Sequence, residues 1–221
     1  MTLLKCDLHL HSNRSPDCNM KPESIIRTCV RRGINCIALT DHNTFGAVRE
    51  LQRLAPFPVI AGEEIKTTRG EIIGLFISEE IPRGMSPGDT AAEIHAQGGV
   101  VYIPHPFDRV RKSALQTEAL LEIVGMVDVI ETRNSRTTFS ADQLAAERFA
   151  DEHGKLRGGG SDAHVWWELG HSYVEMPEFD GAAGFLDALA RGSVHGRLSS
   201  PVAHLASTIT KWRKKYLSSR R

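Results

Sequence analysis

Apolar and polar residues along this chain form alternating strand-like and helix-like segments. The strand-like segments are Leu3–His9, Asn35–Thr40, Phe57–Ala61, Glu71–Ser78, Gly99–Pro104, Met126–Glu131, Lys155–Gly159 and His171–Val174. The helix-like segments are Lys21–Arg32, Thr44–Leu54, Ser86–Gly98, Ala114–Ile123, Ser140–His153 and Asp180–Arg191. Strands separated by helices at this spacing predict a parallel sheet, which can close into a barrel or stay open.

Residues at the ends of two predicted helices support these boundaries. Pro22 falls in the first turn of the first helix, and Gly33 follows its last residue. Proline at the start and glycine just past the end are typical of helices. Ser140 and Gln143 have the spacing of a capping box, which predicts that Ser140 caps the helix running to His153.

Ionisable residues gather at or just after the carboxyl ends of the predicted strands. They are Asp7, His9, His11, Asp41, His42, Glu63, Glu64, His105, Glu131, Asp162 and His164. A (β/α) barrel builds its site from a ring of such strand ends, whereas an open doubly wound sheet concentrates its site at one switch point. The distribution therefore predicts a barrel with the functional residues at one rim.

The first strand carries the strongest local signal, Asp7-Leu-His9-Leu-His11. Residues two apart on a strand point to the same face, so His9 and His11 can bind one metal ion. Asp7 on the same side can be a further ligand or can orient a ligand. The alternative is a solvent-facing strand, but a first strand of a parallel sheet is normally buried, and three buried ionisable groups need a strong partner.

The other strand-end residues extend this pattern to several metal ions. Imidazole together with carboxylate, and without thiolate, suits Zn, Mn or Fe. One carboxylate can bridge two ions, as it does in two-metal hydrolases. The sequence therefore predicts a centre that holds more than one divalent ion.

Composition narrows the choice of partners. The chain has 221 residues, of which 41% are hydrophobic, and its 27 basic and 27 acidic residues balance. Zero net charge gives no broad attraction for nucleic acid or anionic lipid. The four cysteines form no Cys-x-x-Cys pair, which argues against a zinc knuckle and is typical of reduced thiols in a cytoplasmic protein. No apolar run reaches the ~20 residues of a spanning helix, so we expect no membrane partner.

These motifs resemble the PHP (polymerase and histidinol phosphatase) superfamily. The family's motifs are matched in order by DLHLHS at Asp7–Ser12, TDHN at Thr40–Asn43, HP at His105 and GSDAH at Gly160–His164. The resemblance implies a distorted (β/α)7 barrel, similar to a TIM barrel, with a dinuclear or trinuclear site. We expect this domain to cover residues 1–200, followed by a basic tail over residues 201–221 that no motif places near the metals.

The resemblance also implies how the ions would be shared. The first ion would use His9, His11, Glu64 and Asp162, and the second would share Glu64 and add His105. The third would use Asp17, His42 and His164. Glu64 is preferred to Glu63 because the family's bridging acid usually precedes an apolar residue, here Ile65.

The sequence departs from the family at one position. Many members carry a histidine after the bridging acid as a further ligand of the second ion, and this chain has none there. Glu71 is the natural substitute, because it is another hard donor. The alternative is that Glu71 is a solvated residue at the start of its strand.

Candidate catalytic residues lie on the same strand-end loops. Asp162 would orient the nucleophile or accept its proton, and Arg109 and Arg136 are the preferred pair to clamp a phosphate. The predicted activity is hydrolysis of a small phosphate ester of a nucleotide, sugar or amino acid. The alternatives are a nuclease acting on nucleic-acid ends, a C–N hydrolase of the amidohydrolase type, and a non-catalytic metal-binding regulatory module.

Overall fold

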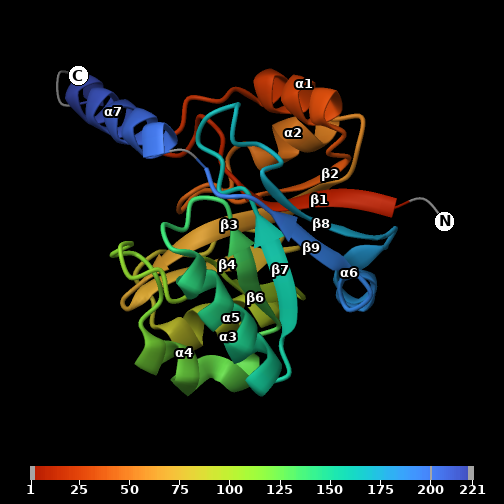
Figure 1. Ribbon diagram of the computed structural model, residues 1–221. Helices are drawn as coiled ribbons and strands as arrows, with labels where there is room; N and C mark the ends of the chain where they lie inside the picture. Colours follow the sequence, from red (N-terminus) through yellow and green to blue (C-terminus); the bar gives the residue numbers. More distant parts are fainter. Residues whose placement is uncertain (1–2, 200, 219–221) are drawn as a thin grey trace.

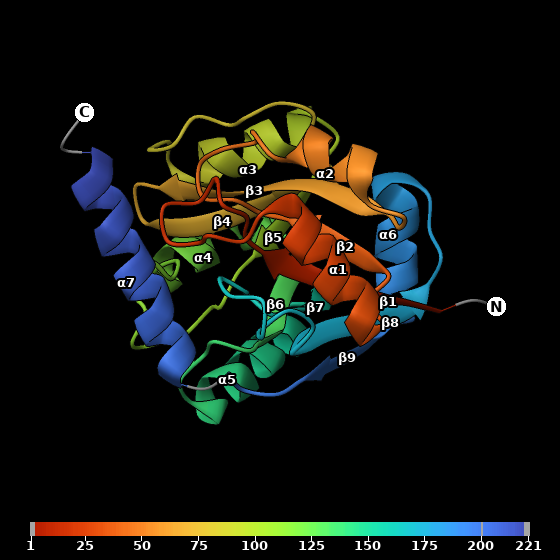
Figure 2. The same ribbon diagram turned by 90° about the horizontal axis from the view of Figure 1, so that it is seen from above.

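The computed structural model describes residues 3–199 and 201–218 (Figures 1 and 2). Its strands form one nine-stranded sheet in the order β7-β6-β5-β4-β3-β2-β1-β8-β9. The strands are β1 (Leu3–Leu10), β2 (Cys36–Leu39), β3 (Val59–Thr67), β4 (Gly70–Leu75), β5 (Val100–Ile103), β6 (Val129–Asn134), β7 (Leu156–Gly160), β8 (Ser172–Pro177) and β9 (Ser193–Gly196). The helices are α1 (Pro22–Arg32), α2 (Val48–Leu54), α3 (Pro87–Ala96), α4 (Thr117–Ile123), the short 3₁₀ helix η1 (Val124–Met126), α5 (Ser140–Glu152), α6 (Gly181–Leu189) and α7 (Pro201–Ser218).

The sheet curls into a nearly closed barrel because the end of β7 meets the end of β1. The backbone N–H of Asp162 donates to the carbonyl of His9 at 2.7 Å, and the N–H of His11 donates to the carbonyl of Ala163 at 3.1 Å. Gly160 permits this approach, since a Cβ there would lie 2.3 Å from the Cβ of His9. Strands β1 to β7 thus form the ring, and the predicted distorted (β/α)7 barrel is confirmed.

The prediction of a uniformly parallel sheet was wrong at two places. β4 runs antiparallel to both β3 and β5, and β8 runs antiparallel to β1 and β9. β3 continues beyond the predicted end at Ala61 and pairs with β4 up to Thr67 and Gly70. No helix-length segment separates these strands, so a tight hairpin replaces the crossover that parallel strands need.

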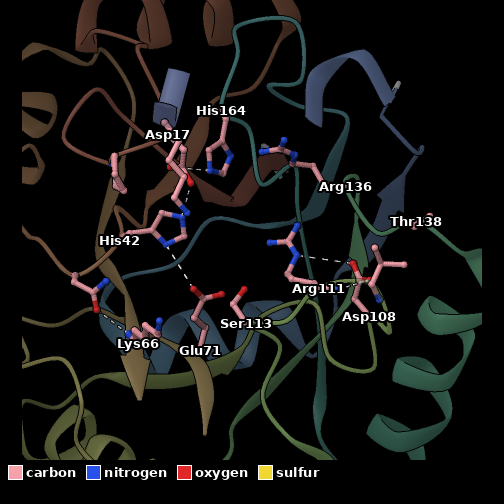
Figure 3. A pocket seen from close by; sticks show the side chains of 14 residues that line it. Asp17, His42, Lys66, Glu71, Asp108, Arg111, Ser113, Arg136, Thr138 and His164 are labelled. Atoms are coloured by element: carbon pink, nitrogen blue, oxygen red, sulfur yellow. Dashed lines mark hydrogen bonds and ion pairs between the residues drawn. The ribbon is translucent and has the colours of Figure 1, made fainter. Parts of the chain in front are cut away.

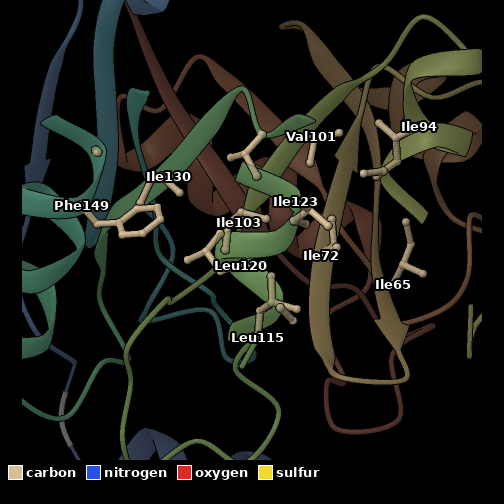
Figure 4. Close-up of a cluster of buried hydrophobic side chains, with 14 of the residues drawn as sticks. Ile65, Ile72, Ile94, Val101, Ile103, Leu115, Leu120, Ile123, Ile130 and Phe149 are labelled. Atoms are coloured by element: carbon tan, nitrogen blue, oxygen red, sulfur yellow. The ribbon is translucent and has the colours of Figure 1, made fainter. Parts of the chain in front are cut away.

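Three clusters of buried apolar side chains hold the barrel and its helices together. One packs α3, α4 and α5 against β3 to β6, as Figure 4 shows for residues such as Ile72, Leu120 and Phe149. A second fills the barrel around Tyr102, which is completely buried. The third joins α1 and α2 to β1 and β2. Helices therefore cover the outside of the ring, which leaves the strand ends free to carry polar residues.

Helix ends agree with the sequence at α1 and differ at α5. Pro22 begins α1, and Gly33 ends it with a positive φ of 69°. The capping box at Ser140 was wrong, because Ser140 is already inside α5 and its side chain makes no capping hydrogen bond. The Gln143 amide instead donates to the carbonyl of Asn134 at 2.7 Å. The side chain of Gln143, which would turn back to the start of the helix in a capping box, is bound to the end of β6 instead.

The basic tail is largely a helix. α7 stands beside the body of the protein, near the rim of the barrel (Figures 1 and 2). Lys214 attaches it, because its ammonium donates to the carbonyls of Asn13, Ser15 and Cys18 at 2.5–2.9 Å. Residues 219–221 of the tail lie outside the described residues. Among the described helices, none is both long and apolar enough to cross a bilayer.

Candidate metal centre

His9 lies on β1 and His11 directly follows the last residue of that strand, and the two side chains point to the same side, as the alternation of a strand requires. Both are completely buried. Their Nε2 atoms are 3.2 Å apart, and each lies 3.4 Å from Oε2 of Glu64. Two imidazoles and a carboxylate therefore converge on one point inside the barrel mouth.

Hydrogen bonds to the other ring nitrogens determine where the neutral imidazoles carry their protons. Nδ1 of His9 lies 3.1 Å from Oε1 of Glu131, which can only accept. The Ser15 hydroxyl donates to Asp41 at 2.6 Å, so it accepts from Nδ1 of His11 at 3.3 Å. Both Nε2 atoms are then left with lone pairs that face each other, an arrangement that a metal cation stabilises.

The surrounding charges favour a cation at this position. Burial opposes a charge on His9, but Asp162, Glu131 and Glu64 raise its pKa well above the usual value. Burial and the neighbouring imidazoles of His164 and His42 hold the pKa of His11 well below its usual value. The carboxylate field that attracts a proton to His9 attracts a metal ion at the same place.

Glu64 is the centre of the cluster. Its Oε1 lies 3.0 Å from Nε2 of His105, and its Oε2 lies 2.9 Å from Nδ1 of His42. Burial disfavours the charged carboxylate, but His42 and His9 hold its pKa well below the usual value. Glu63 points the other way and accepts from the N–H of Ile81 at 2.9 Å. The strand alternation therefore places Glu64, and not Glu63, among the histidines.

Asp162 joins the cluster from the end of β7. Its Oδ1 lies 3.2 Å from Nε2 of His11 and 3.6 Å from Nε2 of His9. Its Oδ2 accepts from Arg111 at 2.6 Å and from the Asn134 amide at 3.3 Å. Burial acts against ionisation, but Arg111 and His9 keep the pKa of this carboxyl well below its usual value. The Asp162 backbone has a positive φ of 52°, a conformation that non-glycine residues seldom adopt.

Asp17, His42 and His164 form the outer part of the cluster. Nδ1 of His164 donates to the carbonyl of Asp162 at 2.8 Å, which leaves its Nε2 facing Oδ1 of Asp17 at 3.3 Å. Nε2 of His42 lies 3.6 Å from Oδ2 of Asp17. The imidazole rings of His11 and His42 are stacked with their centroids 4.4 Å apart, so the outer and inner parts are continuous.

Glu71 belongs to this cluster and is not a solvated residue. It is 7% exposed, and its carboxylate lies 3.7 Å from Nε2 of His105 and 4.0 Å from Nδ1 of His42. Burial and the Glu64 carboxylate raise its pKa. An acidic side chain thus stands where many family members have a histidine.

The donor set fits divalent ions. Three carboxylate oxygens of the cluster are buried and have no hydrogen-bond donor in suitable geometry: Oδ1 of Asp17, Oε2 of Glu64 and Oε2 of Glu71. Buried polar atoms normally have a partner, and a bound ion would supply it. In each of four sets of side chains, three possible ligand atoms lie within 4.8 Å of one another. The sets are His9, His11 and Glu64; His9, His105 and Asp162; His11, His42 and His164; and His42, Glu64 and Glu71.

Three carboxylates outside the cluster fix the backbone and side chains that carry the candidate ligands. Glu131 accepts from His9 and also from the backbone N–H of His105 at 2.7 Å. Asp41 accepts from the N–H of Ser12 at 2.7 Å, and Asp7 accepts from the N–H of Ser161 at 2.8 Å. Asp7 therefore orients the β7 end rather than facing the histidines. Asp41 was noted in the sequence only as part of a motif, and its supporting role follows from contacts across strands.

A pocket of about 410 Å³ opens beside the cluster. Figure 3 shows Arg111 and Arg136 pointing into it, together with His42, Glu71 and His164. Arg109, preferred from the sequence, does not line it: its side chain is 64% exposed and pairs with Asp142 at 2.6 Å. Asp142 in the first turn of α5 draws Arg109 away, and Arg111, two residues later, takes the inward position.

Arg136 lies where the sequence suggested, although buried contacts hold it. It is 4% exposed, lies 3.4 Å from Glu168 and donates to Ser207 of α7 at 2.6 Å. Lys211 of α7 also lines the pocket. No sequence motif places the tail near this cluster, and its position there is seen only in the structure, where α7 folds against the mouth of the barrel.

Comparisons with known proteins agree with the fold and the motifs. Residues 7–137 match the model of the PHP domain, and residues 142–194 match that of the PHP-associated region. The chain therefore belongs to the PHP family, and the resemblance of its motifs is confirmed.

One curated relative is similar in sequence, and two solved structures share the fold. The chain is 34% identical to the uncharacterized protein MJ0417 of Methanocaldococcus jannaschii over 181 residues, 80% of this chain and 72% of the relative. It superposes on PsfC from Pseudomonas syringae with a TM-score of 0.70 and 15% identity, covering 96% of this chain and 99% of the other. It also superposes on a two-domain protein from Bacteroides vulgatus, described as containing a predicted PHP-like metal-dependent phosphoesterase, with a TM-score of 0.68 and 22% identity. That match covers 89% of this chain and 65% of the Bacteroides protein.

Proposed function

We propose that this protein hydrolyses small phosphate esters at a centre of two or three divalent ions, which would be Zn, Mn or Fe. The observation that carries the proposal is the convergence of imidazole lone pairs and carboxylates beside a pocket lined by cationic side chains. His9, His11, Glu64 and Asp162 would hold one ion, and Glu64, His105 and Glu71 a second. Asp17, His42 and His164 would hold a third.

The ions would supply one part of the chemistry. A divalent ion lowers the pKa of a bound water to near neutrality and so provides hydroxide as the nucleophile. The chain would supply the positioning. The Asp162 carboxylate, fixed by Arg111 and Asn134, stands beside His9 and His11 to orient the nucleophile or accept its proton.

The pocket wall fits a phosphate group. Arg111, Arg136, Lys66 and Lys211 line it opposite or beside the histidines. Guanidinium groups bind phosphate oxygens bidentately, and in the transition state they stabilise charge on those oxygens. Arg111 is fixed by its contact with Asp162, so it costs little further ordering when a phosphate binds.

A nucleic-acid end is the second candidate substrate, because α7 extends the positive charge at the pocket beyond the two arginines. Lys211 lines the pocket and Lys215 is exposed on the same helix. A single terminal phosphate needs only part of this surface, whereas a nucleic-acid strand would run along it. The zero net charge of the whole protein chain argues against a long nucleic-acid substrate.

One activity screen distinguishes the small-ester hydrolase from the nuclease and from the other candidate functions. Metal-loaded protein is incubated with mononucleotides, sugar phosphates, amino-acid phosphates and a short single-stranded oligonucleotide, and product release is measured at two salt concentrations. The expected result is release of inorganic phosphate from a small ester, abolished in Glu64→Gln and retained in Glu63→Gln. A clear preference for the oligonucleotide that falls steeply with salt would replace this proposal with the nuclease. Metal binding without turnover of any phosphate ester would favour the regulatory module or a C–N hydrolase.

A further inference from the structure

The outward face of α7 carries an apolar stripe. Leu205, Ile209, Trp212 and Tyr216 are spaced four, three and four residues apart, which brings them to one side of a helix. Their exposed fractions are 61%, 58%, 76% and 55%. Each is thus largely open to solvent, although large apolar side chains are normally covered by a partner when they gather in a patch.

The opposite face of the same helix is the one attached to the barrel. Ser207 is 8% exposed and accepts from Arg136, and Lys214 is held by three backbone carbonyls of residues 13–18. α7 therefore has the reverse of the usual arrangement, with polar residues toward the protein and the apolar stripe toward solvent. Figures 1 and 2 show that it stands beside the body of the protein and not beneath another helix.

Basic residues border the stripe. With about 3.6 residues per turn, Arg213 lies on one side of the Trp212–Tyr216 line and Lys215 on the other. Both are exposed. The sequence of α7 from residue 201 to 218 contains no aspartate or glutamate. The surface is thus apolar at its centre and positive along both edges.

We propose that this face of α7 docks the protein on an anionic lipid surface. An apolar stripe with aromatic residues and flanking Lys and Arg is the pattern of a helix lying in a membrane interface. Trp and Tyr favour the headgroup level, and each nearby basic residue adds attraction to anionic headgroups. The sequence-based expectation of no membrane partner rested on net charge and on the lack of a spanning segment, whereas the orientation of α7 is visible only in the structure.

A second copy of the chain fits this face less well. Pairing two α7 helices through the stripe would set Arg213 and Lys215 of one against those of the other, with no acidic residue of α7 to compensate. An acidic partner protein would also satisfy the charges, and a failure to bind anionic vesicles would favour such a partner over lipid.

Co-sedimentation with vesicles tests the docking directly, on the full chain and without any substrate. The expected result is binding to vesicles of phosphatidylcholine mixed with phosphatidylserine, and little binding to phosphatidylcholine alone. The variant Arg213→Glu/Lys215→Glu should bind at least about tenfold more weakly. Ile209→Ala/Trp212→Ala should also lose binding. Leu121→Ala, at a 49% exposed position on α4, is the matched control and should bind as the unchanged protein does.

The fluorescence of Trp212 provides a second readout on the same samples. Its emission should shift to shorter wavelength on anionic vesicles, and Trp212→Phe should abolish the shift. No binding to anionic vesicles, or equal binding to neutral ones, would overturn the proposal. A dimer in sedimentation that Trp212→Ala disperses, without vesicle binding, would assign the stripe to a second copy instead. None of these outcomes depends on hydrolytic activity.

Discussion

Nε2 of His9 and Nε2 of His11 lie 3.2 Å apart, and both are 3.4 Å from the same oxygen of Glu64. In the neutral imidazoles the protons sit on the far nitrogens, beside Glu131 and Ser15. The near nitrogens therefore have nothing to donate to Glu64. This relationship supports the proposed metal ion between them, and the variants below test it.

Glu64→Gln should disable the centre more than any other single carboxylate change. Its oxygens face His105 and His42 as well as His9 and His11, so the change affects more than one ion. We expect activity to fall by more than the ~10–100-fold typical of residues that only orient ligands. Glu71→Gln should fall less, because its carboxylate approaches only His105 and His42 and at longer distances.

Glu63→Gln is the control for this comparison. It makes the same chemical change at the neighbouring position, on the side of β3 that accepts from Ile81. Metal content and activity should stay near those of the unchanged protein. Equal losses in Glu64→Gln and Glu71→Gln, with both proteins folded, would show that the bridging role is wrongly assigned.

Arg111→Gln should weaken phosphate-ester hydrolysis, whereas Arg109→Gln should leave it nearly unchanged. Arg111 lines the pocket and bonds Asp162, while Arg109 is turned toward Asp142. Loss of a charge-assisted contact worth ~1.5–3 kcal/mol corresponds to about 10- to 100-fold in kcat/KM. Metal content is measured in parallel, because Arg111 also neutralises Asp162. If Arg109→Gln shows the larger loss, the pocket has been assigned the wrong arginine.

Gly160→Ala should damage both the fold and the metal centre. The added Cβ would lie 2.3 Å from the Cβ of His9, and backbone atoms of His9 are nearly as close. β7 would have to move away from β1, at a cost of ~1–3 kcal/mol or more for an overpacked site. Gly125→Ala is the control, because a Cβ there meets nothing within 4 Å. The urea midpoint checks this, and equal midpoints for the two variants would contradict the role given to Gly160.

His171 should make the protein less stable in mild acid. Burial and the nearby charges of Arg197 and Arg32 lower the pKa of this histidine from 6.5 to about 4. Between these values the unfolded chain binds a proton that the folded protein excludes, so stability falls as pH decreases through this window. The urea midpoint is measured from near-neutral pH down to about pH 5. Its decrease should be smaller in His171→Gln, and identical decreases in both proteins would rule out this contribution.

The clustering of the candidate ligands was predictable from the sequence, and their surroundings were only partly so. The alternation on β1 and the positions of His42 and Asp162 just after β2 and β7 predicted that these residues share one rim, because strand direction decides it. Glu64 was expected just after a strand and lies instead within the longer β3. The hairpin between β3 and β4 was not foreseen, since β3 continues past Ala61 without a break in composition.

Loop and tail residues were the least predictable. Arg109 and Arg111 are two residues apart on an irregular segment, where no periodicity tells which one points inward. The partner that decides between them, Asp142, lies 33 residues from Arg109 in the sequence. α7 is fixed by Lys214 donating to backbone carbonyls, and contacts of that kind leave no motif in the residues that accept them.

The most direct test of the metal centre is elemental analysis of protein prepared without chelator, with melting curves before and after chelation. The cluster offers more ligands than one ion can use, so at least two ions of Zn, Mn or Fe should be found per chain. Removing them should lower Tm, because Glu64, Asp162, Asp17 and Glu71 would then face one another without a cation, and an ion bound at 100 times its Kd contributes about 2.7 kcal/mol. One ion or fewer per chain, with Tm unchanged by the chelator, would contradict the account.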